Sequence, residues 1–86
     1  MNVTIRYCTV CFGYHDRALA VAEELRRRFA ANVEVIGGKV GQFDVEVDGT
    51  LIVSQGQSFL ARMKPVLPPK TAQAIAAVER HLDSSG

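Results

Sequence analysis

Two cysteines three positions apart are the residues whose type and spacing could carry chemistry. Cys8 and Cys11 enclose Thr9 and Val10, and the chain has no other cysteine. Two intervening residues let the sulfurs reach bonding distance, so one thiolate can attack a substrate disulfide and the other can resolve the mixed disulfide. A purely structural role explains less, because closing so short a loop removes only about 2 kcal/mol of unfolded-state entropy.

The same spacing also opens metal-binding motifs, both in zinc ribbons and in copper-carrying domains. Structural zinc needs four ligands, and His15 and His81 stand at no familiar ligand spacing from the cysteines. The Met that usually precedes the motif in copper carriers is replaced here by Arg6 and Tyr7. We therefore predict a redox pair that needs no cofactor, with a zinc or copper module as the alternative.

The cysteines fall between a predicted strand and a predicted helix. Apolar residues alternate with polar ones over residues 2–7, which is the period of a strand. Apolar residues then recur at the three- and four-residue spacing of a helix over about residues 14–30, namely Ala18, Ala22, Leu25 and Phe29. A helix N-terminus favours thiolate over thiol and can lower the pKa of a cysteine there.

The rest of the chain completes an α+β pattern. Asn32 is expected to stop the helix, Glu23 to pair with Arg27, and residues 33–36 to form a second strand reached by a parallel crossover. Residues 43–47 and 51–54 predict a hairpin around Asp48-Gly49, and 55–70 a proline-containing loop. Thr71 is expected to cap a last helix with Ile75, Val78 and Leu82 on its buried face, before a frayed tail at 83–86. The order β-α-β-β-β-α predicts a thioredoxin-like two-layer sandwich.

Composition limits the size and the partners of the protein. With 86 residues, 48% of them hydrophobic, we expect a single domain over 1–86. The net charge of +1 makes nucleic acid a poor partner. No apolar stretch is long enough for a membrane span and the first residues lack signal-peptide character, so we expect a cytoplasmic protein without a membrane partner. Paired thiols in that reducing compartment favour redox or metal chemistry.

Three segments resemble the selenoprotein W family, also called the Rdx family. They are Tyr-Cys-Thr-Val-Cys-Phe-Gly-Tyr at 7–14, Gly-Gln-Phe-Asp-Val-Glu-Val-Asp-Gly at 41–49 and Leu-Ile-Val-Ser at 51–54, and the likeness covers about residues 3–54. The resemblance implies a thioredoxin-like fold, a Cys-x-x-Cys redox motif and thiol-dependent antioxidant or oxidoreductase activity. In selenium-containing relatives selenocysteine stands at the position of Cys11, whereas thioredoxin logic makes Cys8 the exposed attacker, so both assignments stay open.

Three neighbouring residues are candidate modulators of the pair. His15 follows Cys11 by one helical turn and could stabilise its thiolate or carry a proton, or could be an exposed helix residue. Phe12 and Tyr14 could form an apolar rim for a partner, or could pack in the core. Expected partners are proteins that carry thiols or disulfides, or low-molecular-weight thiols, and the protein acts as an oxidoreductase, a redox adaptor or a redox-regulated interaction module.

Overall fold

The predicted order of strands and helices is confirmed by the computed structural model, which describes residues 1–55 and 70–85. The elements are β1 (Asn2–Cys8), α1 (Tyr14–Phe29), β2 (Asn32–Gly38), β3 (Phe43–Val47), β4 (Thr50–Gln55) and α3 (Thr71–Ser85). The loop predicted for 55–70 lies outside the described residues, except that Gln55 closes β4 and Lys70 precedes α3.

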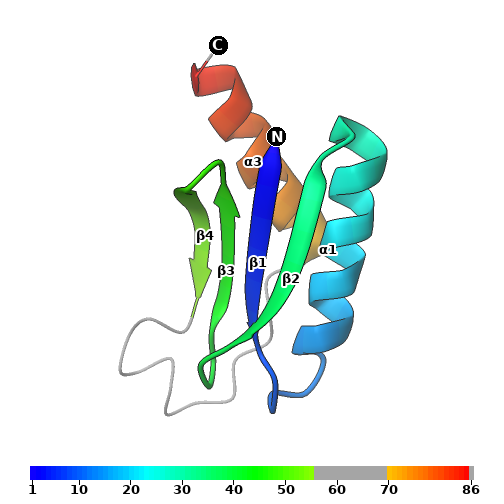
Figure 1. The fold of residues 1–86 in the computed structure, drawn as a ribbon, viewed down its shortest axis with the longest axis vertical. Coiled ribbons are helices and arrows are strands. Elements are labelled where there is room, and N and C mark those ends of the chain that lie inside the picture. Colours follow the sequence, from blue (N-terminus) through cyan, green and yellow to red (C-terminus); the bar gives the residue numbers. More distant parts are fainter. Residues whose placement is uncertain (56–69, 86) are drawn as a thin grey trace.

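The strands form one mixed sheet in the order β2-β1-β3-β4. β1 pairs in parallel with β2, as the predicted crossover requires, and antiparallel with β3, which in turn pairs antiparallel with β4. The two helices of the described residues, α1 and α3, cover the same face of this sheet, so this part of the chain forms two layers (Figure 1). The α+β, thioredoxin-like architecture is therefore as predicted.

The core lies between the sheet and the helices. The predicted stripe of α1 is buried through Ala18, Ala22 and Leu25, whereas Phe29 at its end is only partly buried. On the sheet side the fully buried side chains include Ile5 and Phe43. Each large apolar side chain removed from water in this way contributes about 1.5–3 kcal/mol, so this interface carries most of the stability.

The hairpin between β3 and β4 has the predicted turn. Asp48 and Gly49 have φ values of 49° and 85°, the two positive values that a tight hairpin turn needs. Asp48 also accepts a hydrogen bond from the backbone N–H of Asn2 at 2.9 Å, and its own N–H donates to the Asn2 carbonyl at 2.8 Å. The turn is thereby joined to the start of β1.

The predicted helix stop at Asn32 is wrong. α1 ends at Phe29, and Ala30 follows it in the left-handed conformation with φ 52° and donates its N–H to the Arg26 carbonyl. Asn32 already belongs to β2, where it lies opposite Asn2. An alanine takes the left-handed position because the chain must reverse within two residues to enter the parallel strand.

The ion pair predicted for α1 is also wrong in its acidic partner. Glu24 rather than Glu23 bonds Arg27 and Arg28, and Arg28 continues to Glu79 of α3 at 3.0 Å. The hydrogen bond from Arg28 lowers the pKa of the Glu24 carboxyl, and Arg27 adds to this effect. Glu24 lies three and four residues before Arg27 and Arg28, so it reaches both, and only the further bond from Arg28 to α3 is hidden from the spacing within one helix.

The last helix differs from its prediction at both ends. Thr71 is the first helical residue rather than the cap, and the N–H of Lys70 before it donates to the Gln73 side chain at 3.1 Å. The helix continues to Ser85, where a frayed tail was expected, because its last turns lie along β4 and keep Leu82 packed on the core. Neither of the helices described is long and apolar enough to cross a bilayer.

We predict that Ala30→Gly stabilises the protein by about 1 kcal/mol, because glycine adopts the left-handed conformation without the strain that a Cβ causes. Urea unfolding followed by circular dichroism measures this effect. Ala20→Gly, at an exposed position inside α1, is the matched control and should destabilise by a similar amount. Equal destabilisation by both substitutions would contradict the argument.

Candidate functional site

Cys8 is the last residue of β1, a strand with a neighbour on each side. It lies opposite Gly38 of β2, and its N–H donates to the carbonyl of Gln42 just before β3 at 2.8 Å. Its side chain is 0% exposed and belongs to the hydrophobic core. The backbone and the sulfur of Cys8 are thus both held in place.

Cys11 lies in the loop between β1 and α1. Its carbonyl accepts a hydrogen bond from the N–H of Tyr14 at 3.3 Å, which closes a turn onto the first residue of the helix. Gly13 allows this turn because it has φ 80° at the N-cap position, where it offers no side chain to the helix N–H groups. Cys11 therefore stands at the positive end of α1, as predicted.

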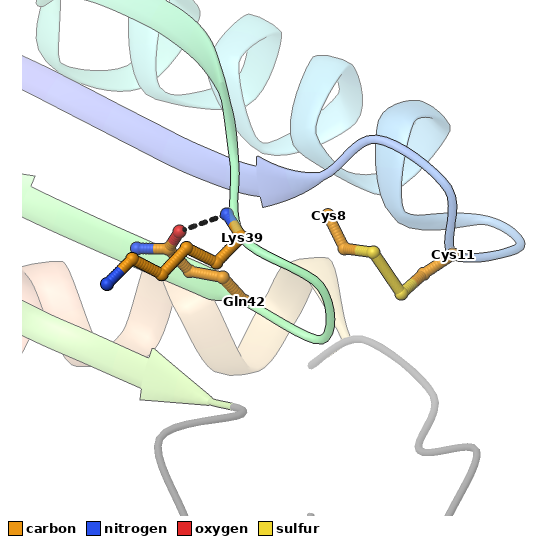
Figure 2. Close-up of a disulfide and its surroundings, with 4 residues drawn as sticks. All are labelled: Cys8, Cys11, Lys39 and Gln42. Atoms are coloured by element: carbon orange, nitrogen blue, oxygen red, sulfur yellow. Dashed lines mark hydrogen bonds between the residues drawn. A yellow bond between two sulfur atoms is a disulfide. The ribbon is translucent and has the colours of Figure 1, made fainter. Parts of the chain in front are cut away.

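The two sulfurs are bonded to each other. A disulfide joins Cys8 to Cys11, with their Cα atoms 5.4 Å apart, and Figure 2 shows it at the end of β1. Cys11 is only partly buried, whereas Cys8 is completely buried. Cys8 is therefore not the exposed sulfur that the thioredoxin analogy suggested, and Cys11 is the residue of the pair that solvent reaches.

The three candidate modulators take different places. Phe12 is 97% exposed beside Cys11, which suits a contact with a partner. Tyr14 is buried and its ring packs edge-on against Phe43, so it belongs to the core rather than to a rim. His15 is exposed, and its ring lies 5.3 Å from that of Tyr7, the partly buried neighbour of Cys8.

A turn that sequence reasoning treated only as a connection lies beside the disulfide. Residues 39–42 link β2 to β3, and the side chain of Gln42 accepts a hydrogen bond from the N–H of Lys39 at 2.7 Å (Figure 2). The amide nitrogen of Gln42 donates to the buried carboxylate of Asp44, also at 2.7 Å. The side chain of Lys39 itself points away from the disulfide in Figure 2.

The two glycines before this turn are a sequence signal that other side chains pack closely against it. A Cβ at Gly37 would lie 2.7 Å from the methyl group of Thr9, and a Cβ at Gly38 would run into the amide of Gln42. Two glycines that end a strand are a signal of close approach by other side chains. The sequence does not reveal which side chains approach, because the strand order decides that.

Groups that could hold a metal ion were also sought. Within 1–55 and 70–85, no three His, Cys, Asp or Glu side chains gather closely enough to bind one. His15 contacts Tyr7, and His81 is on α3. The described residues thus offer the two sulfurs without a third ligand of these types.

Most of the chain matches the model of a known protein family. The Rdx family matches residues 2–67, which includes both cysteines and the turn at 39–42 and extends past the limit of 54 expected from the sequence. No curated protein and no solved structure matches the chain significantly.

We predict that the two thiols of the reduced protein react at very different rates. Because Cys8 is buried and Cys11 is partly exposed, a limiting amount of iodoacetamide should modify Cys11 about tenfold faster. Peptide mass spectrometry after brief labelling measures both rates. In strong denaturant the two rates should become similar; equal rates in the folded protein would mean that burial does not control access to the pair.

Proposed function

Since the chain belongs to the Rdx family, which is selenoprotein W-like, we propose that it is a thiol–disulfide redox protein whose Cys8–Cys11 pair exchanges with the disulfide of a partner. The observation that carries the proposal is a bonded pair with one sulfur in the core and the other reachable from solvent. A structural disulfide does not need one buried and one accessible sulfur, whereas an exchange reaction uses this difference in exposure.

The reduced pair transfers two electrons in two steps. The thiolate of Cys11 attacks one sulfur of the partner disulfide, which forms a mixed disulfide and releases the other half of the partner as a thiolate that takes a proton from water. The thiolate of Cys8 then attacks the Cys11 sulfur, which forms the Cys8–Cys11 disulfide and releases the second half. Two molecules of a low-molecular-weight thiol, or one protein dithiol, return the pair to its reduced form and leave as a disulfide.

The surface around Cys11 favours a protein as the partner. The three most exposed large apolar side chains of the described residues are Phe12 at 97%, Val10 at 76% and Val40 at 66%. All three lie on the two loops at the carboxyl end of β1, where the disulfide is. Apolar side chains grouped at a reactive site are typical of a protein contact.

The proposal includes the organisation and the location of the protein. One hydrophobic cluster joins β1 to α3, which supports a single domain over residues 1–86. We assign the reaction to the cytoplasm, whose thiol pool can supply the electrons that the cycle consumes.

The proposal predicts opposite behaviour of two serine variants toward oxidised glutathione. Cys8→Ser should accumulate the glutathione adduct of Cys11, because the resolving sulfur is missing. Cys11→Ser should form an adduct about tenfold more slowly, because its remaining thiol is buried. Intact-mass spectrometry follows both reactions, and failure of both the wild type and Cys8→Ser to form any adduct would contradict the proposal.

A second prediction concerns the choice of partner. Phe12→Ser should slow exchange with a disulfide-bonded peptide that carries apolar residues next to its cysteines by about fivefold, and leave exchange with oxidised glutathione unchanged. Leu51→Ser is the matched control, because Leu51 is 50% exposed at the opposite end of the sheet. Equal slowing for both substrates would contradict this prediction and mean that Phe12 maintains the conformation of the loop that carries Cys11.

A further inference from the structure

The strand order forces one connection to cross the end of β1. β2 runs parallel to β1 on one side, and β3 runs antiparallel to it on the other. The chain that leaves β2 must therefore pass over the carboxyl end of β1 before it enters β3, as the lower part of Figure 1 shows. Cys8 is the residue at that end, so the turn at 39–42 lies directly beside the backbone of Cys8.

Gln42 holds this turn through four hydrogen bonds to three residues. Its carbonyl accepts the N–H of Cys8 at 2.8 Å, and its N–H donates to the carbonyl of Lys39 at 3.1 Å. Its side chain reaches the N–H of Lys39 on one side and the carboxylate of Asp44 on the other. One residue thus ties the end of β2, the start of β3 and the last residue of β1 together.

Gly38 provides the space for this arrangement. It lies opposite Cys8 in the sheet, and the place where its Cβ would stand is taken by the side-chain amide of Gln42. The same position is 3.4 Å from the Cβ of Arg6, two residues before Cys8. The amide of Gln42 therefore passes across β1 from β3 to β2 at the level of the redox residue.

We propose that Gln42 is a positioning residue for Cys8, which holds the backbone of this cysteine so that its sulfur is aimed at the Cys11 sulfur during the resolving step. This inference rests on the proposed function and adds to it a residue that acts through the backbone of Cys8. The resolving step is an attack within one molecule, and its rate depends on how well the two sulfurs are aligned. The attack by Cys11 on the partner does not depend on where Cys8 lies.

The test separates the two steps. The reduced wild type, Gln42→Ala and Gln42→Met are mixed with oxidised glutathione, quenched with acid at intervals and weighed by mass spectrometry. The glutathione adduct should form within about twofold of the wild-type rate in all three, but decay about tenfold more slowly in both variants. Gln42→Met fills the space beside Gly38 without the hydrogen bonds of the amide, so it serves as the test if the alanine variant does not fold.

Two further variants control for general loosening of the fold. Gly38→Ala should slow the decay of the adduct as the Gln42 variants do, because the new Cβ displaces the amide. Gln73→Ala removes a comparable bond, from the N–H of Lys70 to a glutamine side chain at the start of α3, and should leave both steps unchanged. Circular dichroism of each variant verifies that it is folded.

The outcomes distinguish this inference from the proposed function. Adduct that decays at the wild-type rate in Gln42→Ala and Gln42→Met overturns the role of Gln42 and leaves the redox proposal standing. Equal slowing of formation and decay also overturns it, because a general distortion would act on both steps. If no adduct forms in the wild type or in Cys8→Ser, the redox proposal itself fails.

Discussion

The backbone of Cys8 is held by β2 on one side and by Gln42, just before β3, on the other, and the rest of the site depends on this constraint. An interior strand satisfies its backbone groups through two partners, so its last residue has little freedom to move. Cys11, in contrast, stands on a loop that Gly13 bends into α1. The disulfide consequently joins a rigid sulfur to one at the surface. In the proposed exchange, the surface sulfur is the one that attacks the partner, and the interior sulfur has a defined position from which to complete the reaction.

This arrangement leaves the fold largely independent of the bond. A disulfide that closes so short a loop contributes only about 2 kcal/mol on the chain-entropy argument. The apolar side chains of β1, β3, α1 and α3 form one continuous cluster around Ile5, Leu25, Phe43 and Val78. Each of them contributes a comparable amount by burial alone. The pair can therefore open and close while the sheet and the helices keep their places, which a redox cycle requires.

The sequence predicted the parts of the structure that follow from local pattern. The strand period before Cys8, the stripe of α1 and the Asp48-Gly49 turn each depend on residues close in the chain, and all three agree with the structure. Errors arose where distant segments meet. Arg28 of α1 pairs with Glu79 of α3, which no spacing within one helix indicates, and α3 is extended by its contact with β4. The hydrogen bonds of Gln42 to Cys8, Lys39 and Asp44 could not be predicted for the same reason. They form because the connection between β2 and β3 crosses the end of β1.

The placement of apolar residues adds an independent argument for a functional site at the carboxyl end of β1. Phe43 is completely buried and Phe12 is 97% exposed, a difference in environment that corresponds to about 2 kcal/mol or more of lost burial energy. Single exposed apolar residues are ordinary on protein surfaces. Among residues 1–55 and 70–85, the three most exposed large apolar side chains lie on the two loops beside the disulfide. This departure from the usual burial pattern lies next to the two cysteines of the chain, and it agrees with the proposal that this end of the sheet contacts another protein.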